Sequence, residues 1–438
     1  MTFKYSTSPL TGNNVPVIIE GVRSPFVKSF GVLGDCDALE LFSRTIDGLI
    51  RKTDVAVDAY EEIICGVVTP QVKNINVARD TVLNLGLPHH IHGYTLNRMC
   101  TSSLESIGNA VKSVLSGHSR MILAGGVDVL SDVPITYSKE ARQSLLRFNK
   151  AKSTGEKASA MGSFLPKALA PKPPGITEPL TGMTMGEHAE VMAKLNGISR
   201  HDQDVFAALS HQRAAAAQES GKFQKEIIPV WPSPSFTKCL DKDNIIRPDT
   251  TLEALSQLRP AFDRKYGTIT AGNASTLTDG AAAVVIADEA HAKTLGLRPR
   301  AKIRDMVFVG VNPYEQLLIG PALSIPMILM RNKLGITDID LFEIHEAFAA
   351  QVLSCLRAME SSEFCSRHLG MAKAFGAIPE DKINVNGGAI AIGHPFGATG
   401  ARLVLSMTNE LESRNGTFGV IAICAAGGMS GAMLIERI

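Results

Sequence analysis

The stretch Asn97-Arg98-Met99-Cys100-Thr101-Ser102-Ser103-Leu104-Glu105 places a cysteine directly before a predicted helix. Ser102 and Glu105 have the S-x-x-E spacing of a capping box, so we expect Ser102 to be the N-cap and Glu105 to occupy N3. A thiol at this point faces free N–H groups and the positive end of the helix dipole, which favour the thiolate. The helix is indicated by apolar residues at helical spacing, namely Leu104, Ile107, Val111, Val114 and Leu115.

Two glycine-rich turns near the other end of the chain carry further reactive side chains. Gly393-His394-Pro395 offers an imidazole, and Cys424-Ala425-Ala426-Gly427-Gly428 offers a second thiol. Taken singly, each residue also has a purely structural reading, with the cysteines as small core residues and His394 as a turn histidine. The combination of a thiol before a helix, a base and a second thiol favours a nucleophilic site.

Strands and helices alternate along most of the chain, which predicts an α/β fold with a parallel sheet covered by helices on both faces. Prolines and basic residues set one segment apart, and we expect an inserted loop domain there. The expected division is an N-terminal core at 1–130 and 247–298, the insert at 131–246, and a C-terminal core at 299–438. The main expected strands are Val15–Ile19, Glu62–Val68, Met121–Ala124, Ala281–Ala287, Arg300–Val309 and Gly419–Ile423; the main expected helices are Leu39–Ile50, Asn76–Leu85, Gly186–Leu195, Arg200–Ser220 and Ala401–Leu411.

The second half of the chain repeats the order of the first. Cys100, a helix, an apolar strand and Gly125-Gly126 are matched by His394, a helix, an apolar strand and Gly427-Gly428. Such an echo indicates duplication of one βα unit. Two pseudo-equivalent halves packed together would bring Cys100 and His394 toward a shared axis, since each lies at the start of its corresponding helix.

Composition describes an ordinary globular protein. The 438 residues are 45% hydrophobic and 20% charged, with a net charge of +1, one Trp and six Tyr, so nothing favours nucleic-acid binding. Seven scattered cysteines without a CxxC pair predict neither a disulfide framework nor a zinc site, and indicate a reducing compartment. Residues 1–10 do not resemble a signal peptide, and no apolar run reaches the roughly 20 residues of a membrane span, so we expect a cytoplasmic protein.

Five motifs together resemble the thiolase family, in order and spacing, over nearly the whole chain. The resemblance implies a five-layered α-β-α-β-α fold of two duplicated core domains with an inserted loop domain, a dimer as the minimal unit, and coenzyme A thioester chemistry. Classical thiolases have asparagine where the third motif has its histidine. This histidine, together with Asp243-Asn244-Ile245-Ile246-Arg247-Pro248 and Gly393-His394-Pro395-Phe396-Gly397-Ala398-Thr399-Gly400, is most similar to the thiolase subunit of the fatty-acid-oxidation trifunctional complex. The motifs are Asn97-Arg98-Met99-Cys100, Gly272-Asn273-Ala274-Ser275, His345-Glu346-Ala347-Phe348-Ala349, Gly393-His394-Pro395 and Cys424-Ala425-Ala426-Gly427-Gly428.

The resemblance implies a covalent, ping-pong thiolysis of 3-ketoacyl-CoA in fatty-acid β-oxidation. A thiolate at Cys100 would accept the acyl group, and a neutral imidazole at His394 would take the thiol's proton. Cys424 would protonate the departing acetyl-CoA enolate and deprotonate incoming CoA. Anionic oxygens need donors, and the family pattern assigns His345 with a water to one and the N–H groups of Cys100 and Ala426 to the other.

The same resemblance places four residues along the pantetheine arm of CoA: Met185, Ser275, Ala347 and Phe348. Their structural readings are a core methionine, a turn serine and two helix-packing residues. We expect CoA as a substrate and no tightly bound cofactor or metal; His345-Glu346 does not open an H-E-x-x-H zinc motif, because residue 349 is Ala. The expected partners are a second copy of the chain, in a homodimer or homotetramer, and a hydratase/dehydrogenase α subunit.

Three other readings stay open beside this one. A decarboxylating ketoacyl synthase would use a second histidine in place of Cys424. A biosynthetic acetoacetyl-CoA thiolase would share every catalytic residue and differ only in the shape of its acyl pocket. A non-catalytic lipid-binding protein or scaffold would be marked by loss of Cys100, His394 or Cys424, and all three are present.

The segment from Lys139 to Lys172 stands out by its charge. It has eight basic residues against Glu140 and Glu156, a net of +6 in a chain whose total is +1. We consider a solvated loop, a contact for CoA phosphates, and a docking surface for an acidic partner or a membrane. The basic residues are Lys139, Arg142, Arg147, Lys150, Lys152, Lys157, Lys167 and Lys172.

Overall fold

The computed structural model describes residues 9–162 and 177–438, with residues 161 and 162 as helical backbone only. Nine strands form one path in the order β4-β3-β5-β6-β1-β7-β10-β9-β8, and the short β2 pairs with β6. The strands are β1 (Pro16–Arg23), β2 (Val27–Lys28), β3 (Glu62–Gly66), β4 (His92–Leu96), β5 (Met121–Asp128), β6 (Thr278–Asp288), β7 (Ala301–Gly310), β8 (Leu341–Ile344), β9 (Phe418–Ala425) and β10 (Met429–Arg437).

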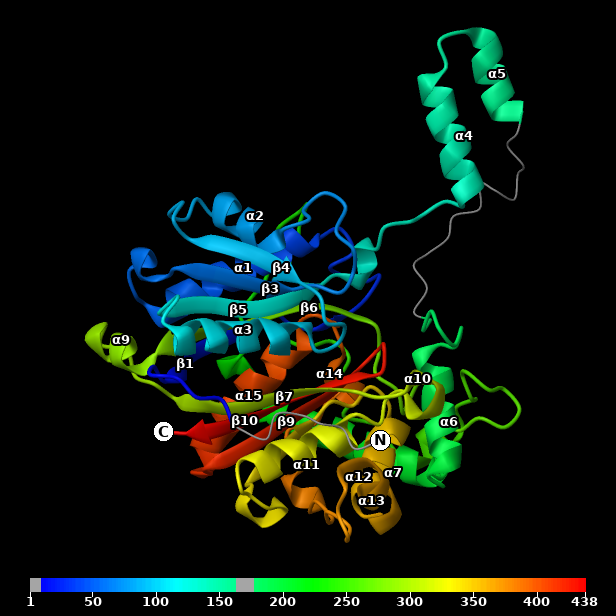
Figure 1. Ribbon diagram of the computed structural model, residues 1–438. Coiled ribbons are helices and arrows are strands. Elements are labelled where there is room, and N and C mark those ends of the chain that lie inside the picture. The colour runs from blue at the N-terminus through cyan, green and yellow to red at the C-terminus, as the bar shows by residue number, and fades with distance from the viewer. Residues whose placement is uncertain (1–8, 163–176) are drawn as a thin grey trace.

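Helices divide this sheet into five layers, as the resemblance implied (Figure 1). Helices α3 (Ser102–Ser116) and α15 (Thr399–Arg414) pack against each other between the two halves of the sheet. Outside one half lie α1 (Ala38–Thr53) and α2 (Val77–Asn84); outside the other lie α11 (Pro321–Arg331) and α12 (Ala349–Met359). The other helices are α4 (Lys139–Lys150), α5 (Thr154–Gly162), α6 (Met185–Leu195), α7 (Arg200–Glu219), α8 (Leu252–Ser256), α9 (Glu289–Thr294), α10 (Pro313–Gln316), α13 (Ser362–Leu369) and α14 (Ala389–Ile392).

The sheet is mixed, so the expectation of a parallel sheet was wrong. β3 runs parallel to β4 and β5, and β8 runs parallel to β9, because helical crossovers lie between these strands along the chain. β5 and β6 are antiparallel, as are β9 and β10, which a tight turn joins directly. A short connection reverses the chain and therefore forces antiparallel pairing.

Three apolar clusters fill the spaces between these layers. The largest lies between the two half-sheets and includes Leu104 and Ile107 of α3 together with Val404 and Leu405 of α15. Two others lie under the outer helices on either side. Because the first turns of α3 and α15 are covered on both faces, hydrophilic residues there are buried too, namely Ser103 and Ser106 of α3 and Thr399 and Arg402 of α15.

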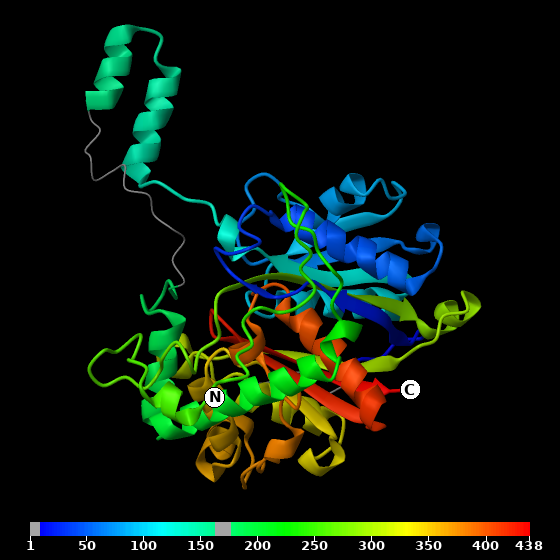
Figure 2. The same ribbon diagram turned by 180° about the vertical axis from the view of Figure 1, so that it is seen from behind.

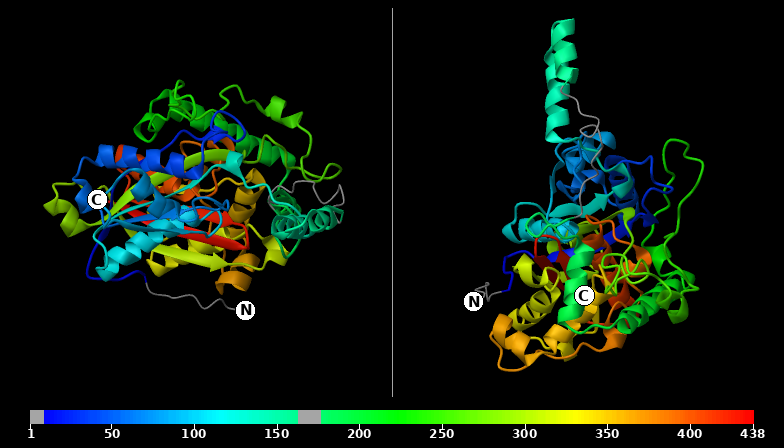
Figure 3. Two further views of the ribbon diagram at one scale, coloured as in Figure 1. Left: turned by 90° about the horizontal axis from the view of Figure 1, so that it is seen from above. Right: turned by 90° about the vertical axis from the view of Figure 1, so that its right-hand side faces the viewer.

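The segment 131–246 is only partly a loop. Its basic part forms the helices α4 and α5, which stand away from the body as a hairpin (Figures 1 and 3). Capping explains these helices: Ser138 Oγ accepts from Ala141 N at 3.2 Å, and Ser153 Oγ accepts from Glu156 N at 3.2 Å. Lys167 and Lys172 lie outside the described residues.

The rest of the segment lies against the body. Helices α6 and α7 form close to where they were expected, and α7 runs along the C-terminal half, as seen from behind in Figure 2. Across the described residues, no helix combines the length and the apolar character needed to cross a membrane.

Candidate active site

Cys100 follows a strained turn at the start of α3. Met99 has a positive φ of 49°, unusual for a side chain of this size. The turn is closed by Ser102, whose hydroxyl accepts from Arg98 N at 2.8 Å and donates to Met99 O at 2.6 Å. The expected capping box is therefore wrong: Thr101 is the N-cap and its side chain makes no cap hydrogen bond. Ser102 shapes the backbone before Cys100 instead.

Burial dominates the ionisation of Cys100. The pKa of the thiol is raised to about 11, mainly by burial and to a smaller extent by the nearby charge of Asp128, against the N–H groups of Ala426 and of Cys100 itself, which lower it. The helix start thus does not by itself produce a thiolate in the resting protein. A base must remove the proton, although the residue is partly accessible to a substrate.

His394 is held as a neutral imidazole of defined tautomer. It lies between α14 and α15 and follows Gly393, which has a φ of 102°. The backbone N–H of His394 donates to Thr278 Oγ1 at 3.0 Å. Ring Nδ1 lies 2.6 Å from Thr399 Oγ1, which donates its proton to Pro395 O at 3.1 Å. The hydroxyl has only one proton, so it accepts from Nδ1–H and leaves the lone pair on Nε2. Burial, and then the charge of Arg402, lowers the pKa of His394 to about 3.

His345 lies directly beside His394. It follows β8, and the two ring centroids are 4.0 Å apart at an interplanar angle of 48°. Burial, followed by the charges of His394 and Arg402, lowers the pKa of His345 well below its ordinary value. Among the described residues, neither of its ring nitrogens has a hydrogen-bond partner, although the side chain is buried. Such a group can serve a substrate oxygen or a water.

Cys424 lies near the end of β9, opposite Cys100. Its thiol is almost fully buried, and burial raises its pKa well above the ordinary value. The charge of Cys100 raises this pKa further, so the two sulfur atoms lie within electrostatic reach of each other. The chain then turns through Ala426, whose N–H points to the Cys100 sulfur, and Gly427 N donates to Glu178 Oε2 at 2.9 Å. Both thiols and a convergent N–H group therefore share one site.

A strap from residue 273 to 277 joins these elements to the residues expected along CoA. Ser275 N donates to Ala347 O at 3.0 Å, Ala274 forms a bridge with Phe348, and Leu277 forms a parallel bridge with His394. Met185, Ala274, Ala347 and Phe348 also belong to one apolar cluster. The strap thus connects Ser275, Ala347 and Phe348 to His394, while Met185 shares only the apolar cluster with them.

A cavity of about 290 Å³ opens beside this strap. Gly272 and Thr276 line it on one side, and Leu255 and Leu258 on another. Lys28, His211, Arg247 and Asp249 supply its charged and polar lining. Of these, only Arg247 lies in a stretch that carries the family resemblance, and none of the four was expected at the site.

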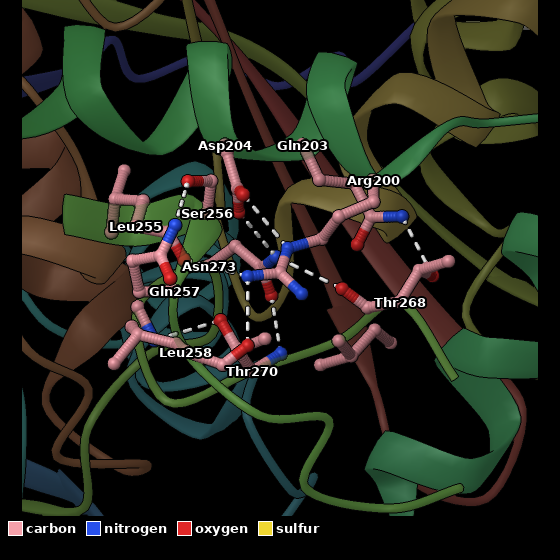
Figure 4. A network of polar contacts seen from close by, with 12 residues as sticks. Arg200, Gln203, Asp204, Leu255, Ser256, Gln257, Leu258, Thr268, Thr270 and Asn273 are labelled. Atoms are coloured by element: carbon pink, nitrogen blue, oxygen red, sulfur yellow. Dashed lines mark hydrogen bonds and ion pairs between the residues drawn. The ribbon is translucent and has the colours of Figure 1, made fainter. Parts of the chain in front are cut away.

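Figure 4 shows the polar network around Arg200, which contacts the residues next to this cavity. Arg200 lies 2.7 Å from Asp204 and donates to Leu255 O at 2.6 Å and Leu258 O at 3.0 Å. Asp204 in turn accepts from Asn273 Nδ2 at 2.9 Å, and Asn273 sets the turn at Gly272. The start of α7 therefore positions both the strap and the wall facing it.

Comparison with known proteins agrees with this geometry. The thiolase N-terminal domain matches residues 16–290, and the thiolase C-terminal domain matches residues 297–437. The chain is 40% identical to a 3-ketoacyl-CoA thiolase of Klebsiella pneumoniae over 96% of each chain. It is 42% identical to a probable 3-ketoacyl-CoA thiolase of Caenorhabditis elegans, over 98% of this chain and 96% of the other.

Solved structures give the same result. A human mitochondrial 3-ketoacyl-CoA thiolase in complex with CoA is 30% identical, with a TM-score of 0.82 over 98% of this chain and 100% of the other. An acetyl-CoA acetyltransferase of Bacillus anthracis is 32% identical, with the same TM-score and coverage. The chain belongs to the thiolase family.

Proposed function

We propose that the protein is a 3-ketoacyl-CoA thiolase, an acetyl-CoA C-acyltransferase that cleaves 3-ketoacyl-CoA with CoA to acetyl-CoA and a shortened acyl-CoA in fatty-acid β-oxidation. The observation that carries this proposal is an arrangement of three contacts: the two thiols lie within electrostatic reach of each other, the two imidazole centroids are 4.0 Å apart, and the starts of α3 and α15 touch where Ala401 N donates to Ser103 Oγ at 2.9 Å. Acyl transfer between two thioesters needs a nucleophile, a base and a separate acid. The names of the relatives, at 40–42% identity, support the same activity.

In the first half-reaction, the Cys100 thiol gives its proton to His394 Nε2 and attacks the 3-keto carbon. The N–H groups of Cys100 and Ala426 stabilise the oxygen that becomes anionic. The bond between C2 and C3 then breaks, leaving an acyl group on Cys100 and an acetyl-CoA enolate. Cys424 protonates the enolate carbon, and His345, with a water, holds the enolate oxygen.

In the second half-reaction, the Cys424 thiolate takes the proton of incoming CoA. The CoA thiolate attacks the acyl-Cys100 thioester, the same N–H pair stabilises the tetrahedral intermediate, and Cys100 leaves as a thiol after protonation by His394. Burial favours this division, because it raises the pKa of both thiols and keeps them protonated until a neighbouring base acts.

We assign CoA to the cavity beside the strap. Arg247 and Lys28 offer positive charge for its phosphates, while Met185, Ser275, Ala347 and Phe348 line the path of the pantetheine arm toward Cys100. CoA acts here as a substrate, and the proposed chemistry needs no tightly bound cofactor.

The test is acetylation of Cys100. Incubation with acetyl-CoA should add an acetyl group to this residue, seen by peptide mass spectrometry, and Cys100→Ala should remove the label. Labelling at another residue, or unaltered labelling in the variant, would overturn the proposal. A thiolysis assay with acetoacetyl-CoA and a long-chain 3-ketoacyl-CoA side by side then separates β-oxidation from the biosynthetic alternative. The similarity to the Bacillus anthracis acetyl-CoA acetyltransferase supports testing that alternative.

We further propose a cytoplasmic homodimer or homotetramer. In the described chain β4 is an edge strand that pairs only with β3. Tyr94 on this strand has an exposed apolar side chain, as do Val72, Ile75 and Leu83 in the segment between β3 and β4. Open strand edges with apolar neighbours are suited to pairing with a second copy. The division into an N-terminal core (1–130 and 247–298), an insert (131–246) and a C-terminal core (299–438) remains our proposal for the domains.

The basic hairpin of α4 and α5 is our candidate for a further contact. It stands away from the body that contains the CoA cavity, which favours docking over a role at the CoA phosphates (Figure 1). The partner would be an acidic hydratase/dehydrogenase α subunit or an anionic membrane surface, since long-range charge attraction acts over about 8 Å at physiological salt.

A further inference from the structure

Asp128 is a buried carboxylate behind the nucleophile that the mechanism does not use. It ends β5, is 0% exposed, and accepts three backbone hydrogen bonds. Oδ1 accepts from Thr69 N at 2.7 Å, and Oδ2 accepts from Val68 N at 3.2 Å and from Gly397 N at 2.5 Å. The first two donors follow β3, and the third belongs to the turn that carries His394. One side chain thus joins both halves of the molecule.

The turn at Gly397, which Asp128 binds, packs tightly against the backbone of Gly66 and Gly126. A Cβ atom on Gly126 would lie 2.2 Å from Gly397 O, and one on Gly397 would lie 2.6 Å from Gly66 O. The turn after His394 therefore rests directly on the backbone at the ends of β3 and β5. Gly66 in turn lies against the start of α3, which follows Cys100. The Asp128 carboxylate and the backbone of these glycines thus form an unbroken series of contacts from the turn of His394 to the start of α3.

The charge of Asp128 works against the nucleophile. Its titratable neighbours are Cys65 and Cys100, and a carboxylate near either thiol opposes formation of the thiolate. Burial raises the pKa of Asp128 to about 6, so the group is ionised at neutral pH. The charge of Asp128 therefore makes the first chemical step harder, and its favourable contribution lies in the three N–H groups that it holds.

We propose that Asp128 is a positioning residue, which fixes the turn of His394 against the strand ends behind Cys100 so that base and nucleophile keep their separation. The inference rests on the proposed function, because the separation matters only if His394 takes the proton of Cys100. A carboxylate suits this place better than an amide, since an amide NH₂ cannot accept from a backbone N–H.

The test compares two measurements on Asp128→Asn. Removing the charge should speed alkylation of Cys100 by iodoacetamide at pH 8, about threefold or more, followed on the Cys100 peptide by mass spectrometry. Losing an acceptor should lower kcat for thiolysis about tenfold or more, with the KM for CoA unchanged. A purely structural defect would slow both processes, and a purely electrostatic role would speed both; either result overturns the proposal.

Gly397→Ala provides the matched variant, and it decides the question if Asp128→Asn does not fold. It displaces the same turn but keeps the carboxylate. We expect an alkylation rate within twofold of the parent and a lower kcat; an unchanged kcat overturns the proposal. Failure of the proposed function is distinguishable, because it would leave the parent protein without thiolysis or Cys100 acetylation.

Discussion

The two thiols of the site lie in different surroundings. Cys100 precedes a helix, follows a residue with positive φ and is partly accessible, while Cys424 lies within a strand and is almost fully buried. Burial is the main cause that raises both pKa values. For Cys100 the N–H groups of Ala426 and Cys100 oppose the increase and the charge of Asp128 adds to it, while for Cys424 the charges of Cys100 and Cys355 add to it and its own N–H opposes it. The surroundings therefore suit one thiol to attack carbon and the other to donate a proton.

Replacing the first thiol should have the largest effect. Cys100→Ala removes the only acyl acceptor in the proposed mechanism, so we expect thiolysis to fall by about 10⁴-fold or more. Steady-state release of acetyl-CoA from a 3-ketoacyl-CoA measures it, with circular dichroism to confirm folding. Substantial remaining turnover would mean that the two thiols do not differ in the way proposed.

Replacing the second thiol should separate the two roles. Cys424→Ala should still be acetylated at Cys100 by acetyl-CoA, because attack on a thioester does not need the second thiol. Its thiolysis should fall by about 10²–10⁴-fold, the usual contribution of general acid–base groups. The control is Cys355→Ala, a buried cysteine of α12 outside the mechanism. If Cys424→Ala kept full turnover, the second thiol would have no part in the reaction.

The imidazole that serves the first thiol should affect acid stability. The folded pKa of His394 is lowered from 6.5 to about 3, so folding favours the neutral form. Its contribution is fully present above pH 6.5 and is lost as pH falls toward 3. Between pH 7 and pH 5, His394→Asn should therefore lose about 2 kcal/mol less of its unfolding free energy than the parent protein. Guanidinium unfolding at the two pH values measures this, and equal losses would contradict the buried, neutral state.

The charged lining of the cavity should act on substrate affinity and not on the thiols. Arg247→Ala should raise the KM for CoA about tenfold while leaving kcat and the alkylation rate of Cys100 near the parent values. Arg247→Lys, which keeps the charge, should recover part of the loss. A fall in kcat with an unchanged KM would instead connect Arg247 to the chemical step.

The hairpin should affect neither thiol. Neutralising Lys150, Lys152 and Lys157 should leave the kcat and the KM for CoA of the isolated protein unchanged, because α4 and α5 stand away from the site. Binding to a candidate α subunit or to anionic liposomes should weaken, with less dependence on salt. The control neutralises Lys238, Lys333 and Lys373, which are exposed on the body. A raised KM for CoA would place the hairpin at the phosphates, and no change in either measurement would make it a solvated element.

Local signals account for what the sequence determined. Helical spacing after Cys100 led to the helix there, the echo between the two halves led to the duplication, and the order of the five motifs led to the family, whose resemblance implied the five layers. These features depend on neighbouring residues, whose periodicity and capping chemistry are visible in the chain itself. Even here one prediction was wrong: Ser102 is not the N-cap of the helix, and its hydroxyl closes the turn before the helix.

Tertiary structure alone decided the rest. The direction of β6, the cavity around Arg247, the Thr399 contact that sets the tautomer of His394, and the contact of Asp128 with Gly397, 269 residues away, have no local signature. The same holds for the acidity of Cys100: its place before a helix predicted a lowered pKa, whereas the pKa is raised. Burial and distant charges shift a pKa more than the adjacent helix end does, and both arise only when segments far apart in the chain are packed together.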